Sequence, residues 1–320
     1  MMSFTHSTQR VPLIEEDVAA ERTLLDAFVR FWAERAGDDL RVTYDSFVAS
    51  TPPVTGVTAV AVDEADAKGW WLFPAGMEDR TTDSALLYLH GGGYVLGSAT
   101  AYRHFASQIV KRVNRPMFLL DYPLAPERAL PVAHDIALAA VKWLGGQGVR
   151  RLAIVGDSAG GGLSLSVMAS LVQHGQSGAS GDGHGNLPAL RAGAAFSPWT
   201  DLSLSGETMT DPRVRDVLLT RDYLADCARK YLAGADPRHA LASPLFGIPP
   251  GMPPLYIQAG SEELLRDDSL RYAERARELG NPVTLEIWEG LHHVFHFNVA
   301  ELASARAALD RVAGFLASYL

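Results

Sequence analysis

A serine flanked by glycines stands where it could act as a nucleophile. Residues 156–160 read Gly-Asp-Ser-Ala-Gly, follow the apolar run 151–155 and precede a stretch rich in glycine and alanine. In a Gly-x-Ser-x-Gly turn between a strand and a helix, the glycines avoid clashes that larger side chains would make, and the serine hydroxyl is left exposed. An ordinary strand-to-helix turn with a solvated serine would use the same residue types. The pattern predicts Ser158 as a candidate nucleophile whose partners must lie elsewhere in the chain.

Three consecutive glycines could supply the groups that stabilise a reaction intermediate. The motif His-Gly-Gly-Gly at residues 90–93 directly follows the apolar run 85–89. Unshielded backbone N–H groups can stabilise the negative charge that develops on a carbonyl oxygen during nucleophilic attack. We expect such donors at Gly91 and Gly92, with Ala159, the residue after the serine, as the third. A phosphate-binding loop is the alternative, but neither Gly-Lys-Ser/Thr nor Gly-x-Gly-x-x-Gly accompanies the run.

A histidine cluster near the end of the chain could supply a general base. Residues 290–296 read Gly-Leu-His-His-Val-Phe-His, between the last predicted strand and the final predicted helix. Histidine can accept the proton of a serine hydroxyl near neutral pH. His292, His293 and His296 also resemble a metal site, but adjacent histidines rarely face one ion and no matching cluster of Asp or Cys is evident. We therefore expect a base here, with no metal and no cofactor.

A carboxylate must orient the histidine and stabilise its charged form. Four carboxylates follow the apolar run 255–258, namely Glu262, Glu263, Asp267 and Asp268. Asp267 or Asp268 is interpreted as capping a helix that begins near residue 268, because acidic side chains offset the helix dipole there. One glutamate is then free to serve the histidine. The resulting chain order of serine, acid and histidine is that of the α/β hydrolases.

The hydrophobic pattern shows which elements could position these groups. From residue 85 onward, short apolar runs alternate with longer helical segments, which predicts a mostly parallel sheet covered by helices on both faces. Catalytic groups of such sheets lie beyond the carboxyl ends of the strands. The predicted strands are 85–89, 117–120, 152–155, 192–196, 255–258 and 283–288, after a hairpin formed by 57–62 and 69–73; the predicted helices are 102–113, 134–145, 160–173, 267–279 and 300–318.

Two segments are not needed by this sheet. Apolar residues at helical spacing predict an amphipathic helix between residues 12 and 37. Residues 203–247 interrupt the alternation without a sheet strand. We expect residues 1–50 and 203–247 to form a helical cap above the catalytic edge. Residues 51–202 and 248–320 would then form the core of a single catalytic domain.

Composition narrows the possible partners and location. A chain of 320 residues, 48% of them hydrophobic, can bury a large core. The net charge of −9 and the lack of any basic run argue against binding to nucleic acid. The single cysteine excludes an intramolecular disulfide. The chain start lacks a signal-peptide profile and no apolar stretch reaches membrane-spanning length, so we expect a cytoplasmic protein without a membrane partner.

Three motifs together resemble those of a known family. They are His-Gly-Gly-Gly at 90–93, Asp-Tyr-Pro-Leu-Ala-Pro-Glu at 121–127 and Gly-Asp-Ser-Ala-Gly-Gly at 156–161. In combination they resemble the hormone-sensitive-lipase-like carboxylesterases, bacterial lipolytic family IV, over residues 85 to about 300. The resemblance implies an α/β-hydrolase fold with a mostly parallel central sheet, helices on both faces and a helical cap.

The resemblance also selects the acid and the base. The acid of the family lies in a segment of the type Asp-Pro-Leu-Arg-Asp-Glu, which aligns with 263–268 and implies Glu263, a glutamate in place of the usual aspartate. The base lies in a Gly-x-x-His-x-Phe segment, which matches 290–295 and implies His293. The separation, 293 − 263 = 30 residues, also resembles the spacing of the family. Adjacent Glu262 is the rival for the acid.

The implied function is a serine carboxylic-ester hydrolase (EC 3.1.1.-) that acts on small to medium acyl esters through a Ser158–His293–Glu263 triad and an acyl-enzyme. A lactonase or an amidase would use the same triad and differ in pocket shape. A non-catalytic small-molecule receptor on the same fold is a further alternative, which the presence of all three triad members disfavours. The expected partner is a small-molecule ester, and a homodimer is left open.

Overall fold

The protein is built around one twisted, nine-stranded sheet. The computed structural model describes residues 7–65, 67–77, 82–176 and 187–320. The strand order is β1-β9-β8-β7-β6-β4-β5-β3-β2; β3 is antiparallel to both of its neighbours, and all the other neighbouring pairs of described strands are parallel. The strands are β1 (Thr8–Val11), β2 (Val57–Glu64), β3 (Ala67–Pro74), β4 (Ser84–Leu89), β5 (Met117–Leu120), β6 (Arg151–Asp157), β7 (Ala189–Phe196), β8 (Leu255–Gly260) and β9 (Val283–Trp288).

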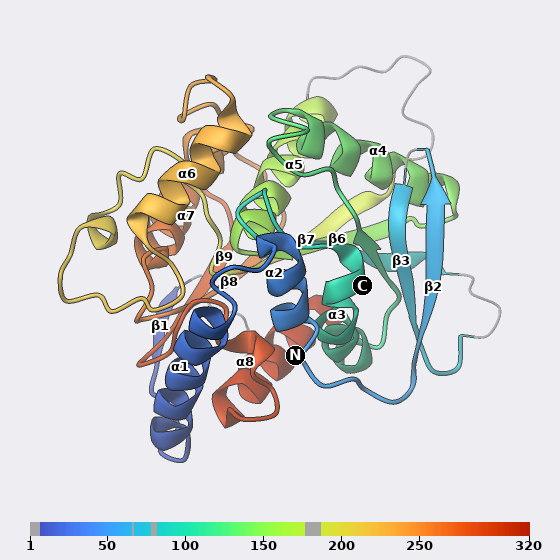
Figure 1. Cartoon of the computed structure of the whole chain (residues 1–320). Helices are drawn as coiled ribbons and strands as arrows, with labels where there is room; N and C mark the ends of the chain where they lie inside the picture. Colours follow the sequence, from blue (N-terminus) through green and yellow to red (C-terminus); the bar gives the residue numbers. More distant parts are fainter. Residues whose placement is uncertain (1–6, 66, 78–81, 177–186) are drawn as a thin grey trace.

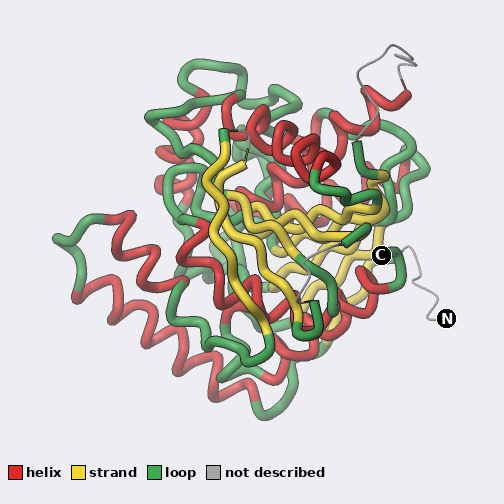
Figure 2. Tube along the Cα trace, turned by 90° about the vertical axis from the view of Figure 1, so that its right-hand side faces the viewer, coloured by secondary structure: helices red, strands yellow, loops and turns green. Residues whose placement is uncertain are grey.

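Helices cover both faces of this sheet, as Figure 2 shows. The apolar side chains of α3 and α8 pack on one face, and those of α4, α5 and α7 pack on the other. The helices are α1 (Asp17–Glu34), α2 (Leu40–Val48), α3 (Ala99–Val113), α4 (Val132–Gly146), α5 (Ser158–Gln176), α6 (Arg221–Leu232), α7 (Arg266–Glu278) and α8 (Ala303–Ala317). Short 3-10 turns occupy Glu207–Met209, Pro244–Phe246 and Phe295–Phe297.

Burial on both faces explains why the central strands are apolar runs without alternation. All six residues of β4 are buried. Leu87 and Leu89 contribute to the core on the α4–α5 face, whereas Leu86 and Tyr88 contribute to the core on the α3–α8 face. The prediction of a mostly parallel sheet with helices on both faces is confirmed. The predicted hairpin is also present, as β2 and β3.

In the described residues, the two segments outside the predicted core contain three α-helices and one strand. Helices α1 and α2, blue in Figure 1, and α6, gold, belong to the segments expected to form a cap. The first fifty residues differ from the expectation at Thr8–Val11, which pair in parallel with β9 as an edge strand of the sheet. This strand, Thr-Gln-Arg-Val, has no apolar run that would predict it. Its formation depends on the free edge that β9 offers.

Within the described part of the chain, no helix has both the length and the apolar character that crossing a lipid bilayer requires.

Candidate active site

Ser158 occupies the turn between β6 and α5. Its φ is +50°, a left-handed conformation that is strained for a residue with a side chain. A methyl group added to Gly160 would collide with the carbonyl oxygens of Leu89 and His90, and one added to Gly156 would collide with that of Gly160. The glycines on either side of the serine are therefore required by close backbone contacts. This is the strained turn that a Gly-x-Ser-x-Gly sequence predicts.

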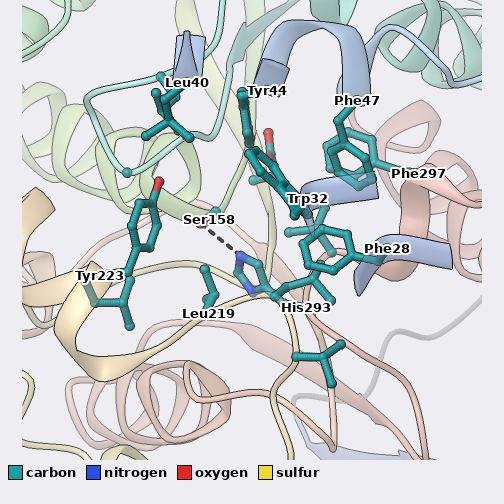
Figure 3. Close-up of a pocket in the computed structure, with 18 of the residues that line it drawn as sticks. Phe28, Trp32, Leu40, Tyr44, Phe47, Ser158, Leu219, Tyr223, His293 and Phe297 are labelled. Carbon is teal, nitrogen blue, oxygen red and sulfur yellow. Dashed lines mark hydrogen bonds between the residues drawn. The ribbon is translucent and has the colours of Figure 1, made fainter. Parts of the chain in front are cut away.

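His293 reaches the serine from the loop after β9. Its Nε2 lies 3.0 Å from Ser158 Oγ, an interaction drawn as a dashed line in Figure 3. Burial lowers the pKa of His293, but the hydrogen bond and negative charge of Glu263 outweigh it, so the pKa lies above its ordinary value. The serine and the histidine that the sequence analysis selected are thus in hydrogen-bond contact.

Glu263 stands behind the histidine. It is fully buried in the loop after β8, and its Oε2 lies 3.3 Å from His293 Nδ1. Glu262 instead accepts a hydrogen bond from Ser261 at 3.1 Å. The carboxylate that faces the base is therefore that of Glu263, despite the extra methylene relative to the aspartate of the family motif.

Ser197 is a site residue that the sequence analysis missed. It follows β7, at the same edge of the sheet, and its hydroxyl donates to Glu263 Oε2 at 2.7 Å. The same hydroxyl accepts the N–H of Val294 at 3.2 Å, which ties the carboxylate to the loop that carries His293. The only signal for it in the sequence is its position directly after a predicted strand.

The glycine loop differs from the expectation at its first glycine. The N–H of Gly91 donates to Asp157 Oδ1 at 3.0 Å and so already has an acceptor within the protein. Gly92 and Gly93, in contrast, line the pocket together with Ser158, and no acceptor for their N–H groups is found among the described residues. Ala159 lies in the first turn of α5, where a backbone N–H has no acceptor within the helix.

The histidine of the glycine motif holds the loop in shape. His90 Nδ1 is 2.8 Å from the carbonyl oxygen of Gly91, and its ring stacks on Tyr122 with centroids 4.3 Å apart. Tyr122 in turn donates to the carbonyl oxygen of His90 at 2.6 Å. Burial lowers the pKa of His90, which favours the neutral ring. The segment 121–127 thus braces the glycine loop from behind.

The other two histidines of the cluster have separate partners. His292 Nδ1 lies 2.7 Å from Glu21 Oε1 of α1, and its Nε2 lies 3.1 Å from Asn298 Oδ1. His296 is fully buried, with Nε2 3.1 Å from Gln258 Oε1. In the described ranges, no three His, Cys, Asp or Glu side chains are grouped as ligands for a metal ion.

The two aspartates of the acidic segment do not cap α7. That helix has no side-chain cap at its N-terminus. Asp268 Oδ2 accepts the backbone N–H groups of Thr200 at 2.7 Å and Asp201 at 2.8 Å, and Asp267 accepts that of Thr208 at 3.0 Å. Both aspartates lie in the first turn of α7, where acidic side chains offset the helix dipole as expected, but neither makes a cap hydrogen bond, because both carboxylates bind the segment that follows β7.

A largely apolar pocket of about 460 Å³ opens above Ser158. Helix α1 contributes Phe28 and Trp32, and the residues around the start of α6 contribute Leu219 and Tyr223 (Figure 3). Helix α2 contributes Leu40, Tyr44 and Phe47, which are spaced so that they lie on one face of the helix. The pocket is lined by Phe28, Val29, Trp32, Leu40, Tyr44, Phe47, Gly92, Gly93, Leu96, Asp157, Ser158, Val217, Leu218, Leu219, Tyr223, Leu224, His293, Val294 and Phe297. Both segments outside the predicted core thus supply walls of one pocket.

Comparison with known proteins places this geometry in context. Residues 86–297 match a family model described as the alpha/beta hydrolase fold. An acetyl-hydrolase from Streptomyces hygroscopicus is 40% identical over 248 residues, covering 77% of this chain and 78% of the relative. An esterase from Acinetobacter venetianus is 31% identical over 241 residues, covering 73% and 74%. A crystal structure of an esterase from the bacterial hormone-sensitive lipase family is similar with a TM-score of 0.82 and 32% identity, covering 92% of this chain and 97% of the other.

Proposed function

The chain belongs to the hormone-sensitive-lipase family of α/β hydrolases, whose members compared above are esterases, and we propose that it cleaves small to medium acyl esters with a Ser158–His293–Glu263 triad. One observation carries the proposal. Ser158 Oγ, both ring nitrogens of His293 and the Glu263 carboxylate form a continuous chain of contacts at the floor of an apolar pocket.

The proposed reaction proceeds through an acyl-enzyme. Ser158 Oγ attacks the acyl carbon while His293 Nε2 takes its proton, and Glu263 stabilises the imidazolium that forms. The tetrahedral intermediate collapses, the bond between acyl carbon and alcohol oxygen breaks, and His293 protonates the leaving alcohol. A water molecule then gives a proton to His293 and attacks the acyl carbon; the bond from that carbon to Ser158 Oγ breaks, the acid is released, and His293 returns the proton to Ser158 Oγ.

We assign the oxyanion to the N–H groups of Gly92, Gly93 and Ala159. The support is their position, since the two glycines line the pocket beside Ser158 and Ala159 lies in the first turn of α5. The Gly91 N–H is left out because Asp157 already accepts it. Donors that are aimed before the reaction stabilise developing charge without reorganisation.

The pocket supports uncharged substrates of limited size. Its lining is almost entirely apolar apart from Tyr44, Asp157, Ser158, Tyr223 and His293. A volume of about 460 Å³ accommodates small to medium acyl and alcohol groups. The similarity to an acetyl-hydrolase supports acetyl esters as the first substrates to test.

The experiment compares Ser158→Ala with Ser318→Ala, which removes an exposed hydroxyl at the end of the chain. Turnover of p-nitrophenyl acetate should fall by about 10,000-fold or more in Ser158→Ala and remain unchanged in the control. Wild-type enzyme should release a burst of one p-nitrophenol per active site. Retention of a tenth of the activity by Ser158→Ala would refute the nucleophile, and turnover by neither protein would favour a receptor.

A substrate panel then defines the class of ester. We expect p-nitrophenyl acetate and butyrate to be cleaved faster than the dodecanoate, because an acyl chain of twelve carbons exceeds the proposed range. A matched acetanilide and a γ-lactone in the same panel distinguish ester hydrolysis from the amidase and lactonase alternatives.

A further inference from the structure

We propose that Tyr44 of α2 is a positioning residue for the oxyanion-binding loop. Its hydroxyl begins a hydrogen-bond chain that runs through Tyr102 to the carboxylate of Asp157, and that carboxylate holds the glycine loop. The inference rests on the proposed function, because it gives a residue of the N-terminal segment a part in the same reaction.

The contacts determine the direction of the chain. Tyr44 Oη lies 2.8 Å from Tyr102 Oη, and Tyr102 donates to Asp157 Oδ2 at 3.0 Å. An ionised carboxylate only accepts hydrogen bonds, and each tyrosine has a single proton to donate. Since Tyr102 gives its proton to Asp157, Tyr44 must be the donor to Tyr102.

Asp157 connects this chain to the glycine loop through its second oxygen. Oδ1 accepts the N–H of Gly91 at 3.0 Å and the hydroxyl of Tyr88 at 2.7 Å. A methyl group at Gly91 would collide with the carboxylate. The first glycine of the loop is thus pressed against Asp157, and a small movement of that carboxylate must displace the two glycines that follow.

Burial increases the effect of losing any one hydrogen-bond donor to the Asp157 carboxylate. Asp157 is 1% exposed, and Tyr88 and Tyr102 are completely buried, so water does not replace a lost donor. Burial raises the pKa of Asp157 to about 6, and its hydrogen bonds from Tyr88, Tyr102 and Gly91 oppose that rise. Loss of a donor therefore favours a neutral carboxyl, which holds the Gly91 N–H less strongly than a carboxylate does.

Helix α2 is fixed firmly enough to place the Tyr44 hydroxyl. Arg41, one turn before it, donates to the carbonyl oxygens of Val95 at 3.0 Å and Ala125 at 2.9 Å. Asp45, the next residue, accepts from Ser98 Oγ at 2.7 Å. Both anchors lie on segments that pack against the glycine loop, because Val95 donates its N–H to the carbonyl oxygen of Gly92. The helix and the loop therefore form one hydrogen-bonded unit.

A role in catalysis must be separated from simple contact with substrate, because Tyr44 also lines the pocket. Tyr44→Phe keeps the ring and removes only the hydroxyl. Tyr102→Phe breaks the same chain at a residue that is not part of the pocket lining. The matched control is Tyr272→Phe, since Tyr272 is fully buried in α7 and its hydroxyl has no hydrogen-bond partner in the described residues.

The test is a double-mutant cycle on p-nitrophenyl acetate hydrolysis, with the inhibition constant of a trifluoromethyl ketone as the readout of oxyanion stabilisation. We expect Tyr44→Phe and Tyr102→Phe each to lower kcat about three- to tenfold, the loss of one hydrogen bond, with KM changed less than twofold. Affinity for the ketone should fall in parallel with kcat. The double variant should be no worse than Tyr102→Phe alone, because Tyr44 acts through Tyr102.

Three results would overturn the inference. The first is a double variant whose loss of kcat is the product of the two single losses. The others are a Tyr44→Phe variant in which only KM changes, and one in which kcat and ketone affinity change as little as in Tyr272→Phe. If Tyr102→Phe fails to fold, the kcat and ketone data for Tyr44→Phe decide alone. Ser158→Ala is measured alongside. Loss of activity in that variant together with a multiplicative cycle rejects the role of Tyr44 and leaves the proposed function standing.

Discussion

Replacement of Glu263 by glutamine tests the proposed triad at its least conventional member. The change keeps the size of the side chain and an oxygen that can accept a hydrogen bond, but it removes the charge that faces His293. In the transition state, His293 carries a full positive charge whose Nδ1 lies 3.3 Å from the carboxylate oxygen. The substitution therefore removes an electrostatic interaction that is strongest when the base is protonated.

The separation of the two groups sets the expected size of the effect. At an effective dielectric constant of about 20, unit charges at 3.3 Å attract each other by about 5 kcal/mol. The amide oxygen of glutamine recovers part of this as a hydrogen bond. A remaining loss of about 4 kcal/mol corresponds to a decrease in kcat of about 1,000-fold. KM should change little, since Glu263 is completely buried and does not line the pocket.

The assay is steady-state hydrolysis of p-nitrophenyl acetate, with active-site titration to correct for traces of wild-type enzyme. Glu262→Gln is the matched control, because the same chemical change is made one residue away, where the side chain contacts Ser261 instead of the base. It should stay within threefold of wild type. A loss below tenfold in Glu263→Gln, or an equal loss in Glu262→Gln, would refute the electrostatic argument.

Further outcomes follow from other contacts in the structure. Glu263 raises the pKa of His293 above its ordinary value of 6.5, and the base must be neutral to accept a proton. We therefore expect kcat/KM to fall as the pH decreases through a midpoint above 6.5. A midpoint at or below 6.5 would contradict the ion pair. In thermal unfolding, Gly160→Ala should lower the free energy of unfolding by more than about 3 kcal/mol, because the new methyl group meets two carbonyl oxygens. The control Gly314→Ala in α8, which has open space around it, should be neutral or stabilising. Asp17→Ala removes the carboxylate that accepts the N–H groups of Ala303 and Ser304 at the start of α8, at 2.8 and 2.7 Å. In denaturant unfolding, the variant should lose about 1–2 kcal/mol of stability, while kcat stays within twofold of wild type. An unchanged unfolding midpoint would show that these two hydrogen bonds do not stabilise the protein.

The sequence was sufficient to predict the features that burial patterns and steric limits over a few neighbouring residues control. The strands β4, β6 and β8 were predictable because burial on both faces leaves an uninterrupted apolar run. The turn at Ser158 was predictable because a strained serine with close backbone neighbours requires glycine on both sides. The family resemblance had singled out His293 among the clustered histidines, and its loop follows β9 at the same edge of the sheet as the turn after β6.

The glycine loop shows where such reasoning ends. Three adjacent glycines are equivalent as a pattern, and their order along the chain does not reveal which N–H groups remain free. That is decided by Asp157, a carboxylate 66 residues away in the chain, which accepts the N–H of Gly91. Ser197 and the edge strand β1 could not be predicted for the same reason. Their roles depend on partners from distant segments, which are Glu263 for Ser197 and β9 for β1.

Local patterns in the sequence thus predicted the sheet and Ser158 as the candidate nucleophile, because periodicity and steric limits act over a few residues, whereas the choice of His293 came from the family resemblance. The tertiary structure decided which glycines face the pocket, which glutamate faces His293 and how the N-terminal helices close the site. Those outcomes depend on hydrogen bonds between buried groups far apart in the chain, such as that of Ser197 to Glu263, and burial leaves each such group only the partners that the fold brings to it.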